Sequence, residues 1–412
     1  MNSKTWKYSF ILLFGIGLSN IGAWIYLIAL NLIVLDKTGS ALAVAALYMI
    51  SPISALFTNW WAGSLIDRSN KRRIMIGLDL VRAFILLFLP FCSSMWQIYS
   101  IVFLVNIANS LFRPSSMVYI AKLIPKGDRK RFNSLLSFIQ SGAFLIGPAI
   151  AGLLFMMGTP SFAIYINAAA FLLSGLLTVL MPDVEKGEVT GAAVKKSAYS
   201  TLIEDWKTVI FFSRHHKYVM VVYLLFSFIM IVMASALDSL EAVFAKEVLS
   251  LSNEEYGFLV SAAGAGIIAG AAVNALFVKK IPTSLSIGLG AVVMALGYMG
   301  YSLSGSFPAA ALSFFFLAFS IAFANTGFMT FYQFNIPSEY MGRITSAYGL
   351  LEAGLIVIAV FTLGAAAQLV STAAAVLAGS VVMLCAALFL CGICLLPSES
   401  FHNIKSSINE SR

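Results

Sequence analysis

The sequence predicts an all-α membrane protein with about twelve transmembrane helices. The first observation is composition: 60% of the 412 residues are apolar and 11% are charged, with a mean hydropathy of +0.92, whereas roughly 25% of a soluble domain is charged. The second is that basic residues gather in short segments between apolar runs. The third is that long stretches carry no charge and are long enough for two spans of roughly 20 residues each: 132–182, 281–338 and 353–397.

The apolar runs divide the chain into two halves of six spans. Short turn-like segments separate the spans within the long runs at 158–160, 305–308 and 368–372. We expect an amino-terminal six-helix bundle in residues 1–181, a cytoplasmic linker in 182–217, a carboxy-terminal six-helix bundle in 218–396 and a cytoplasmic tail in 397–412.

The linker has two parts. Its first part is rich in glycine and charge and is predicted to be a loop. Its second part has helical periodicity, with an apolar face opposite Glu204, Asp205 and Lys207. That face comprises Tyr199, Leu202, Ile203, Trp206, Val209 and Ile210. An amphipathic helix of this kind is predicted to lie on the inner leaflet of the membrane.

Lysine and arginine indicate the orientation of the spans. Lys37 and Lys246 fall in expected outer loops, and Arg82 and Arg113 fall within apolar runs. The rest of the 26 basic residues occupy the termini and the loops on one side. Because positive loops face the cytoplasm, we expect a multi-pass protein of the cell membrane with both termini cytoplasmic. The net charge of +8 is then a topology signal and does not indicate a nucleic-acid partner.

A strongly basic stretch, Gly63 to Arg73, lies between the second and third spans and reads Gly-Ser-Leu-Ile-Asp-Arg-Ser-Asn-Lys-Arg-Arg. We expect a short loop at the water interface. It resembles the loop signature of the major facilitator superfamily, Gly-x-Leu-x-Asp-Arg-x-Gly-Arg-Lys. The residues that match by identity are Gly63, Leu65, Asp67 and Arg68, and those that match in charge are Lys71 and Arg72. Asn70 replaces a glycine and also tolerates a left-handed backbone. The resemblance implies a loop that gates one end of a transport pathway.

The two halves also repeat each other in sequence. A constant offset of 212 residues aligns Ile124-Pro125 with Ile336-Pro337. The same offset gives these further pairs: Arg131 and Arg343, Ser134 and Ser346, Gly142 and Gly354, Gln140 and Glu352, Arg113 and Asn325. Two repeats of a six-span unit, with a substrate site near the midplane, are what the major facilitator fold contains. The predicted fold is therefore two pseudo-symmetric six-helix bundles.

A helix-packing element lies in the fifth span. Gly147, Pro148 and Gly152 resemble the Gly-Pro-x-x-Gly-Gly element of superfamily antiporters, with Gly142 upstream and Ala151 in place of one glycine. Small residues let helices approach closely, and proline permits a bend. The element either packs the halves together or takes part in gating. The resemblance favours export as the direction of transport.

Glu352 is the first candidate for proton coupling. It lies about 13 Å along a helix from Arg343, near the membrane centre, and its counterpart in the first half is neutral Gln140. An ionisable group at this depth costs roughly 2.5–3.5 kcal/mol or more, and a lone carboxyl there can take up and release a proton. The alternative is a permanently protonated acid bonded to a neighbouring helix.

Asp238 and Glu241 are further candidates for proton coupling. They are three residues apart on the seventh span, so they share one helix face, near its outer end. They are either solvated at the outer mouth, or they form a second protonation point or a vestibule that attracts cations. Asp79 and Arg82, three apart on the third span, are expected to neutralise each other.

Polar and aromatic residues within the apolar runs are candidates for lining a substrate cavity. Such a lining suits large amphipathic compounds, although aromatic side chains also anchor helices at the membrane interface. The candidates are Asn20, Trp24, Asn31, Arg113, Tyr119, Asn325, Tyr332 and Gln333. Arg113 is a candidate to pair with Glu352 or to hold an anionic substrate. Where the resembled pattern has an acid, at the end of the fourth span, this chain has Lys122.

The sequence carries no pattern of a metal or catalytic centre. The four cysteines lie in apolar runs, so Cys391-Gly-Ile-Cys394 is interpreted as two membrane thiols. There is no histidine cluster, phosphate loop or nucleophile paired with a base. We therefore expect no enzyme, no metal and no cofactor, with a proton gradient as the energy source.

These observations predict a secondary transporter that resembles the drug:proton antiporter and macrolide-efflux branch of the superfamily. We expect a monomer in the lipid bilayer that exports an amphipathic compound in exchange for protons by alternating access. Two alternatives stay open: a dedicated exporter of one compound, such as a siderophore or a peptide antibiotic, and a flippase for a lipid-linked substrate. The two-half repeat disfavours a channel.

Overall fold

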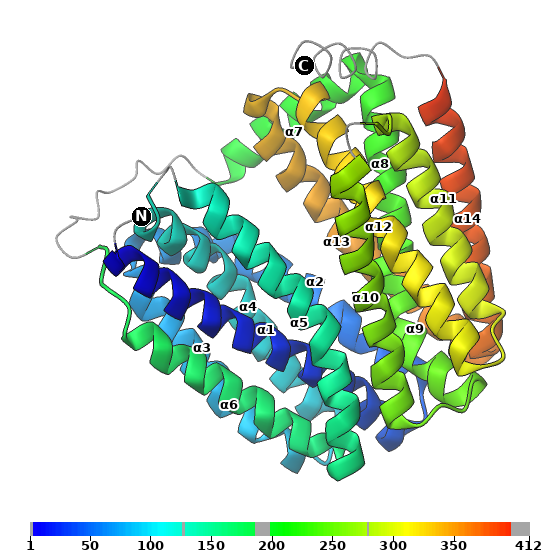
Figure 1. Cartoon of the computed structure of the whole chain (residues 1–412). Coiled ribbons are helices and arrows are strands. Elements are labelled where there is room, and N and C mark those ends of the chain that lie inside the picture. Colours follow the sequence, from blue (N-terminus) through cyan, green and yellow to red (C-terminus); the bar gives the residue numbers. More distant parts are fainter. Residues whose placement is uncertain (1–2, 126–127, 186–197, 278–279, 397–412) are drawn as a thin grey trace. The chain divides into compact units, whose positions relative to one another are not determined.

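The computed structural model describes the chain except residues 1–2, 126–127, 186–197, 278–279 and 397–412 (Figure 1). In the described part every regular element is helical, and 12 helices are long and apolar enough to cross a membrane. The expected all-α fold with about twelve spans is therefore confirmed. The chain divides into two compact units. The first comprises residues 1–192 and 251–261, and the second comprises residues 193–250 and 262–412.

The first unit is built on long helices that run along its length (Figure 1). They are α1 (Ser3–Thr38), α2 (Ala41–Arg68), α3 (Lys71–Leu87), α4 (Met95–Leu123), α5 (Arg129–Met157) and α6 (Pro160–Val179), with a short 3-10 turn, η1 (Leu89–Phe91), after α3. α1 packs against α5 and α6, α3 against α4 and α6, and α2 against α4. The first turns of α10 (Asn253–Phe277) also belong to this unit.

The basic stretch 63–73 is mostly helical, which corrects the expected loop. α2 continues to Arg68 and α3 begins at Lys71, so two residues connect them. The residues between Gly63 and Asn70 are compatible with a helix, so α2 can continue past Gly63. The backbone amide of Arg73 donates to Asn70 Oδ1 at 3.0 Å and so caps the start of α3. Asn70 has φ −66°, so it contributes a cap and not a left-handed turn.

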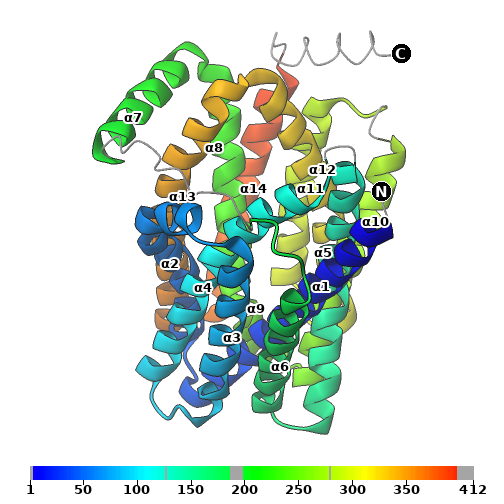
Figure 2. The ribbon, with the colours of Figure 1, turned by 90° about the vertical axis from the view of Figure 1, so that its left-hand side faces the viewer.

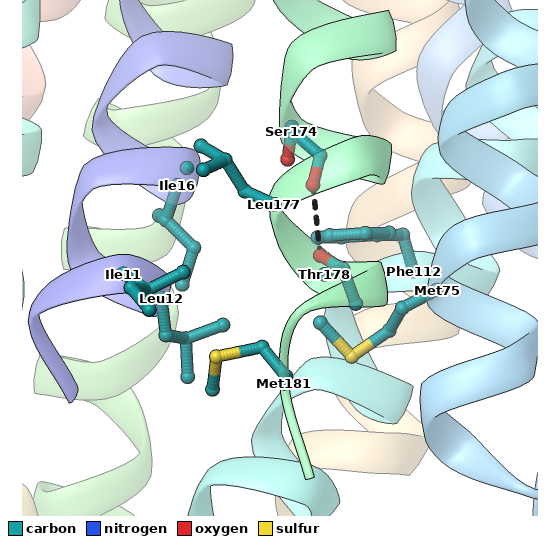
Figure 3. A pocket seen from close by; sticks show the side chains of 10 residues that line it. Ile11, Leu12, Ile16, Met75, Phe112, Ser174, Leu177, Thr178 and Met181 are labelled. Atoms are coloured by element: carbon teal, nitrogen blue, oxygen red, sulfur yellow. Dashed lines mark hydrogen bonds between the residues drawn. The ribbon is translucent and has the colours of Figure 1, made fainter. Parts of the chain in front are cut away.

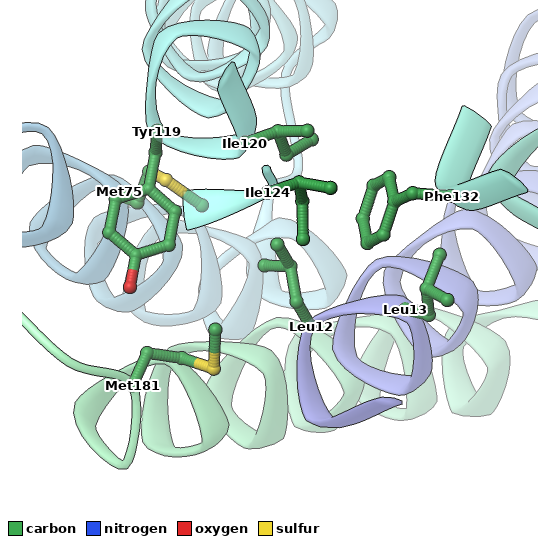
Figure 4. Close-up of a cluster of buried hydrophobic side chains, with 8 residues drawn as sticks. All are labelled: Leu12, Leu13, Met75, Tyr119, Ile120, Ile124, Phe132 and Met181. Atoms are coloured by element: carbon green, nitrogen blue, oxygen red, sulfur yellow. The ribbon is translucent and has the colours of Figure 1, made fainter. Parts of the chain in front are cut away.

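An apolar cluster closes the end of the first unit that carries the α2–α3 connection (Figure 4). Side chains from α1, α3, α4 and α5 meet there, and Tyr119 and Met75 are completely buried. Because protein interiors are close-packed, side chains from four helices fix the spacing of those helices at this end. The members are Leu12, Leu13, Met75, Tyr119, Ile120, Ile124, Phe132 and Met181.

The second unit begins with α7 (Ala198–His215). Its first span runs from Lys217 to Val248 and combines α-helical with π-helical turns. The parts of this span are α8 (Lys217–Ile231), the π-helical η3 (Val232–Leu237), α9 (Asp238–Val243) and the π-helical η4 (Phe244–Val248). After α10 follow α11 (Thr283–Ser302), α12 (Phe307–Asn335), α13 (Ser338–Leu369) and α14 (Thr372–Leu395). α11 packs against α12 and α14, and α13 packs against α14 and η3.

The 212-residue repeat is visible in the helix bounds. α4 and α12 each have 29 residues, and both their first and their last residues stand 212 positions apart. Both helices are followed by an isoleucine with an extended backbone, Ile124 with ψ 121° and Ile336 with ψ 115°. The cause is the proline after each isoleucine, which disfavours helical geometry in the residue before it. One local rule therefore ends the corresponding helix in both halves.

Part of the apolar face of the amphipathic helix α7 packs against other helices, and its predicted place on the inner leaflet stays a prediction. Val209 and Phe212 are buried, whereas Ile210 is 47% exposed. The helix packs against α13 and α8 (Figure 2), and Ser213 Oγ lies 3.0 Å from the hydroxyl of Tyr348 on α13. Contact with these helices selects the buried face, which leaves Ile210 outside it. The side chains of Tyr199, Leu202 and Ile203 lie outside the described residues.

Candidate functional site

Glu352 lies on α13 and is partly buried in the second unit. The hydroxyl of Tyr223 on α8 donates to its Oε1 at 3.4 Å. Among the residues of this unit that the structure describes, no lysine or arginine lies within ion-pair distance of the carboxyl. The hydrogen-bond partner is thus a neutral hydroxyl, which can donate to a carboxylate and accept from a carboxylic acid.

Tyr223 also joins Glu352 to a cluster of aromatic rings on α8, α12 and α13. The ring centroid of Tyr223 lies 5.5 Å from that of Tyr348, 5.7 Å from that of Phe328 and 5.9 Å from that of Tyr332. Of these, Tyr332 was a predicted lining residue, and the other rings carried no sequence pattern of their own. The arrangement surrounds the ring that contacts the Glu352 carboxyl with three other aromatic rings.

Asp238 lies between the two π-helical segments of the seventh span. Its Oδ1 accepts a hydrogen bond from the hydroxyl of Tyr298 on α11, and the hydroxyl of Tyr301 donates to the backbone carbonyl of Glu241 at 3.1 Å. Both tyrosines are 1% exposed. The carboxyl of Asp238 is therefore held at a contact between helices of the second unit. The sequence analysis did not identify these two tyrosines. The available indication was that Tyr298 and Tyr301 are three residues apart, as are Asp238 and Glu241.

Asp79 and Arg82 on α3 form a buried ion pair, which confirms the expected neutralisation. The guanidinium also donates to Asn109 Oδ1 on α4 at 2.6 Å. Its central carbon lies 4.3 Å from the ring centroid of Phe112 and 4.2 Å from that of Phe171. Hydrogen bonds and aromatic rings thus replace water around the charge, which lowers the cost of holding it within a span.

Phe112 also borders a narrow apolar gap between α1, α3, α4 and α6 (Figure 3). Its polar lining consists of Ser174 and Thr178, and the Thr178 hydroxyl donates to the Ser174 backbone carbonyl at 2.9 Å. The gap has no room for a water molecule. In this structure it is a void between packed helices.

Two predicted lining residues of the first unit make specific contacts within it. Asn31 is buried and donates to the Tyr48 hydroxyl at 2.9 Å. Tyr119 is completely buried in the apolar cluster and donates to the Pro182 carbonyl at 2.7 Å. Both side chains are therefore engaged in the packed interior of this unit.

The other predicted lining residues are spread over both units. In the first unit Asn20 is partly buried and Arg113 is exposed. In the second unit Asn325 and Gln333 are exposed on α12, and the Tyr332 hydroxyl donates to the Met341 carbonyl at 3.0 Å. Arg113 and Glu352 belong to different units, so their pairing stays a prediction.

Small residues of α5 make two close contacts in the first unit. A Cβ atom on Gly147 would lie 2.6 Å from the Cβ of Trp24, a predicted lining residue. A Cβ atom on Gly152 would lie 2.9 Å from the carbonyl oxygen of Glu254. Both positions therefore require glycine for packing. Gly142 has open space around it, and α5 is continuous through its proline.

Two expected gating residues are anchored to the end of α6 and to the segment after it. Lys71 Nζ lies 3.2 Å from Glu185 Oε1, and Arg72 donates to the Val179 carbonyl. Burial alone would raise the pKa of Glu185, but hydrogen bonds from Lys71 and Lys122 hold that pKa below its ordinary value. The surroundings of Gly63 and the side chains of Asp67 and Arg68 lie outside the described part of the structure.

Within the described part of the chain there is no group of three or more side chains able to hold a metal ion. Cys92, Cys385, Cys391 and Cys394 are all free thiols. The candidate site is therefore built from carboxyl groups and tyrosine hydroxyls within the spans of the second unit.

Comparison with known proteins agrees with this architecture. The family model of the Major Facilitator Superfamily matches residues 12–360. An uncharacterised MFS-type transporter of Bacillus subtilis (strain 168), YfiS, is 24% identical over 338 residues, which cover 80% of this chain and 79% of that protein. Macrolide efflux protein A of Streptococcus pyogenes is 25% identical over 158 residues, which cover 37% of this chain and 39% of that protein.

A solved structure of a mutant of the nucleoside transporter NupG matches with a TM-score of 0.75 at 13% identity, over 93% of this chain and 98% of that chain. Identity this low shows a shared fold and leaves the substrate open. The family match covers spans of both units, and the structure has the twelve apolar helices that the fold requires. The chain therefore belongs to the major facilitator superfamily and is a multi-pass membrane transporter.

Proposed function

We propose that this transporter exports amphipathic compounds in exchange for protons, by alternating access. The observation that carries the proposal is Glu352, a carboxyl well inside α13 whose described partner is the neutral hydroxyl of Tyr223. A charge at membrane depth costs roughly 2.5–3.5 kcal/mol or more. A conformational change that alters the exposure of this carboxyl therefore also alters its affinity for a proton.

The aromatic cluster supports an amphipathic substrate. The rings of Phe328 and Tyr332, which are only partly buried, offer apolar faces, and a carboxylate beside them attracts a basic group. A carboxyl that binds a proton no longer attracts a cation, so proton and substrate compete for Glu352. That competition links the exit of the substrate to the entry of a proton.

One further observation supports export. Part of the chain is similar to a macrolide efflux protein. We assign Asp238, with Tyr298 as its partner, as a second protonation point. We further propose a monomer of the cell membrane; the basic segments support a cytoplasmic location for both termini.

The test is uptake of labelled amphipathic compounds into inside-out vesicles that carry an imposed pH gradient. Wild type is expected to accumulate such compounds when the gradient is present, and Glu352→Gln is expected to lose this uptake while still folding. Asp36→Asn is the matched control, because Asp36 is an exposed carboxyl outside the site.

Full gradient-driven uptake by Glu352→Gln would contradict the role of Glu352 and move the coupling to Asp238. Failure of wild type to accumulate any compound of a broad panel would contradict a general amphipath exporter. That outcome would favour a transporter dedicated to one compound or to a lipid-linked molecule.

A further inference from the structure

Three segments of the first unit meet at the end that carries the α2–α3 connection. They are that connection, the end of α4, and the residues directly after α6. Glu185, from the third segment, contacts the other two: its Oε1 accepts from Lys122 Nζ at 2.9 Å and lies 3.2 Å from Lys71 Nζ. Its Oε2 accepts from the backbone amide of Lys71 at 2.7 Å. One carboxylate thus joins two lysines and the first turn of α3.

The electrostatic balance explains why an acid is needed here. The side chains of Lys71 and Glu185 are 8% and 9% exposed, so their charges are shielded from water. Both ammonium groups lie within about one hydrogen-bond length of the same oxygen, and without a negative charge between them they would repel each other. The start of α3 adds the partial positive charge of a helix N-terminus.

Neighbouring contacts hold the same segment in place. Asn70, which caps α3, donates its Nδ2 to Asp183 Oδ1 at 2.7 Å, and the Glu185 amide donates to the same oxygen at 3.2 Å. On the α4 side, Tyr119 donates to the Pro182 carbonyl. Residues 182–185 are therefore bonded to both the α2–α3 connection and α4.

We propose that Glu185 is a positioning residue for transport, the acid that holds the α2–α3 connection and the end of α4 at a fixed spacing through Lys71 and Lys122. It supplies from the start of the linker a negative charge that the last turn of α4 lacks, because that turn carries Lys122. The proposal rests on the chain being a transporter, and on neither the nature of the substrate nor proton coupling.

The first test is a set of variants purified and melted in detergent. Glu185→Gln is expected to lower Tm by on the order of 5 °C, because it removes one partner of a buried ion pair. Adding Lys122→Gln is expected to restore part of the loss, because it removes one of the two repelling charges. Adding Lys122→Glu is expected to restore more, because it returns a carboxylate within reach of Lys71.

Strictly additive Tm changes in these double variants would overturn the proposal, since independent sites add and coupled sites do not. Asp36→Asn serves again as the control for loss of an exposed carboxyl. This test needs no transport activity, so it stands even where the amphipath-export proposal fails.

The second test separates positioning from a purely structural role. Transport of whichever compound the wild type carries is measured per folded protein after reconstitution. Glu185 lies outside the spans that carry Glu352 and Asp238. Glu185→Gln is therefore expected to lower kcat several-fold with KM unchanged. Adding Lys122→Glu is expected to restore kcat. An unchanged kcat, or a change confined to KM, would overturn the proposal.

Discussion

The two units hold their membrane-depth carboxyl groups in different ways. In the first unit Asp79 is paired with a cation, Arg82, which is itself bonded to Asn109. In the second unit Asp238 and Glu352 have tyrosine hydroxyls as their described partners. An ion pair favours one charge state of both partners, whereas a hydroxyl can partner a carboxyl in either state. The comparison indicates that the first unit keeps its charges constant and that the second is suited to changing them.

The largest expected effect, a loss of folding stability, comes from breaking the Asp79–Arg82 ion pair. Arg82→Met leaves one partner of a buried ion pair and is expected to destabilise the protein by about 3–5 kcal/mol. Thermal melting in detergent measures this loss. Asp79→Asn added to Arg82→Met removes both charges and is expected to recover most of the stability. A double variant no more stable than Arg82→Met would show that the two charges are not coupled.

The next largest effect is expected on transport and tests the carboxyl of Glu352. Tyr223→Phe keeps the ring but removes the hydroxyl that donates to Glu352, a long hydrogen bond of 3.4 Å worth on the order of 1 kcal/mol. Gradient-driven uptake is expected to fall about fivefold. In a Glu352→Gln background the same change is expected to add no further loss.

Uptake in the vesicle assay measures this effect, and Tyr165→Phe, a tyrosine on α6 of the first unit, is the matched control. An equal loss with and without the Glu352 carboxyl would show that the Tyr223 hydroxyl acts elsewhere.

The smallest effect extends the comparison to paired charges outside the spans. The pKa values of Glu185 and Asp183 lie below their ordinary 4.5 and 3.8; in Asp183 the hydrogen bond from Asn70 is the main cause. A carboxyl whose pKa is lowered by folding stabilises the folded protein above its ordinary pKa, and this stabilisation is lost as the pH falls through the lowered value. When the pH is lowered below about 4.5, the Tm of wild type is expected to fall. Glu185→Gln is expected to show a shallower drop, and parallel curves would contradict this assignment.

The fold followed from the sequence because hydropathy and positive charge act locally. Twelve apolar runs predict twelve helices whatever lies beside them, and a proline after Ile124 or Ile336 ends its helix by a steric effect on the preceding residue. The prediction for the end of α2 was wrong because the basic residues were interpreted as a loop. Arginine and lysine are good helix formers, and Asn70 caps the next helix.

The site was only partly predictable. Glu352 was identified because a single charge in an apolar run is conspicuous. Its partner Tyr223 is 129 residues away, and Glu185 is 114 residues from Lys71. No local periodicity reports contacts over such separations. The residues that shared a local signal, such as Asp79 and Arg82 on one helix face, were paired correctly.

The covalent connection between the two six-span halves of the sequence is short. The chain is bonded to the first unit as far as Glu185, and α7, which starts at Ala198, packs on helices of the second unit. Residues 186–197 join these anchored ends, and the chain from Glu185 to Ala198 spans at most about 47 Å when fully extended. A tether of this length keeps each half at an effective concentration of roughly millimolar with respect to the other. Cleavage within it would make their association bimolecular, so halves expressed as separate chains would assemble only as far as their own contacts and their density in the membrane permit.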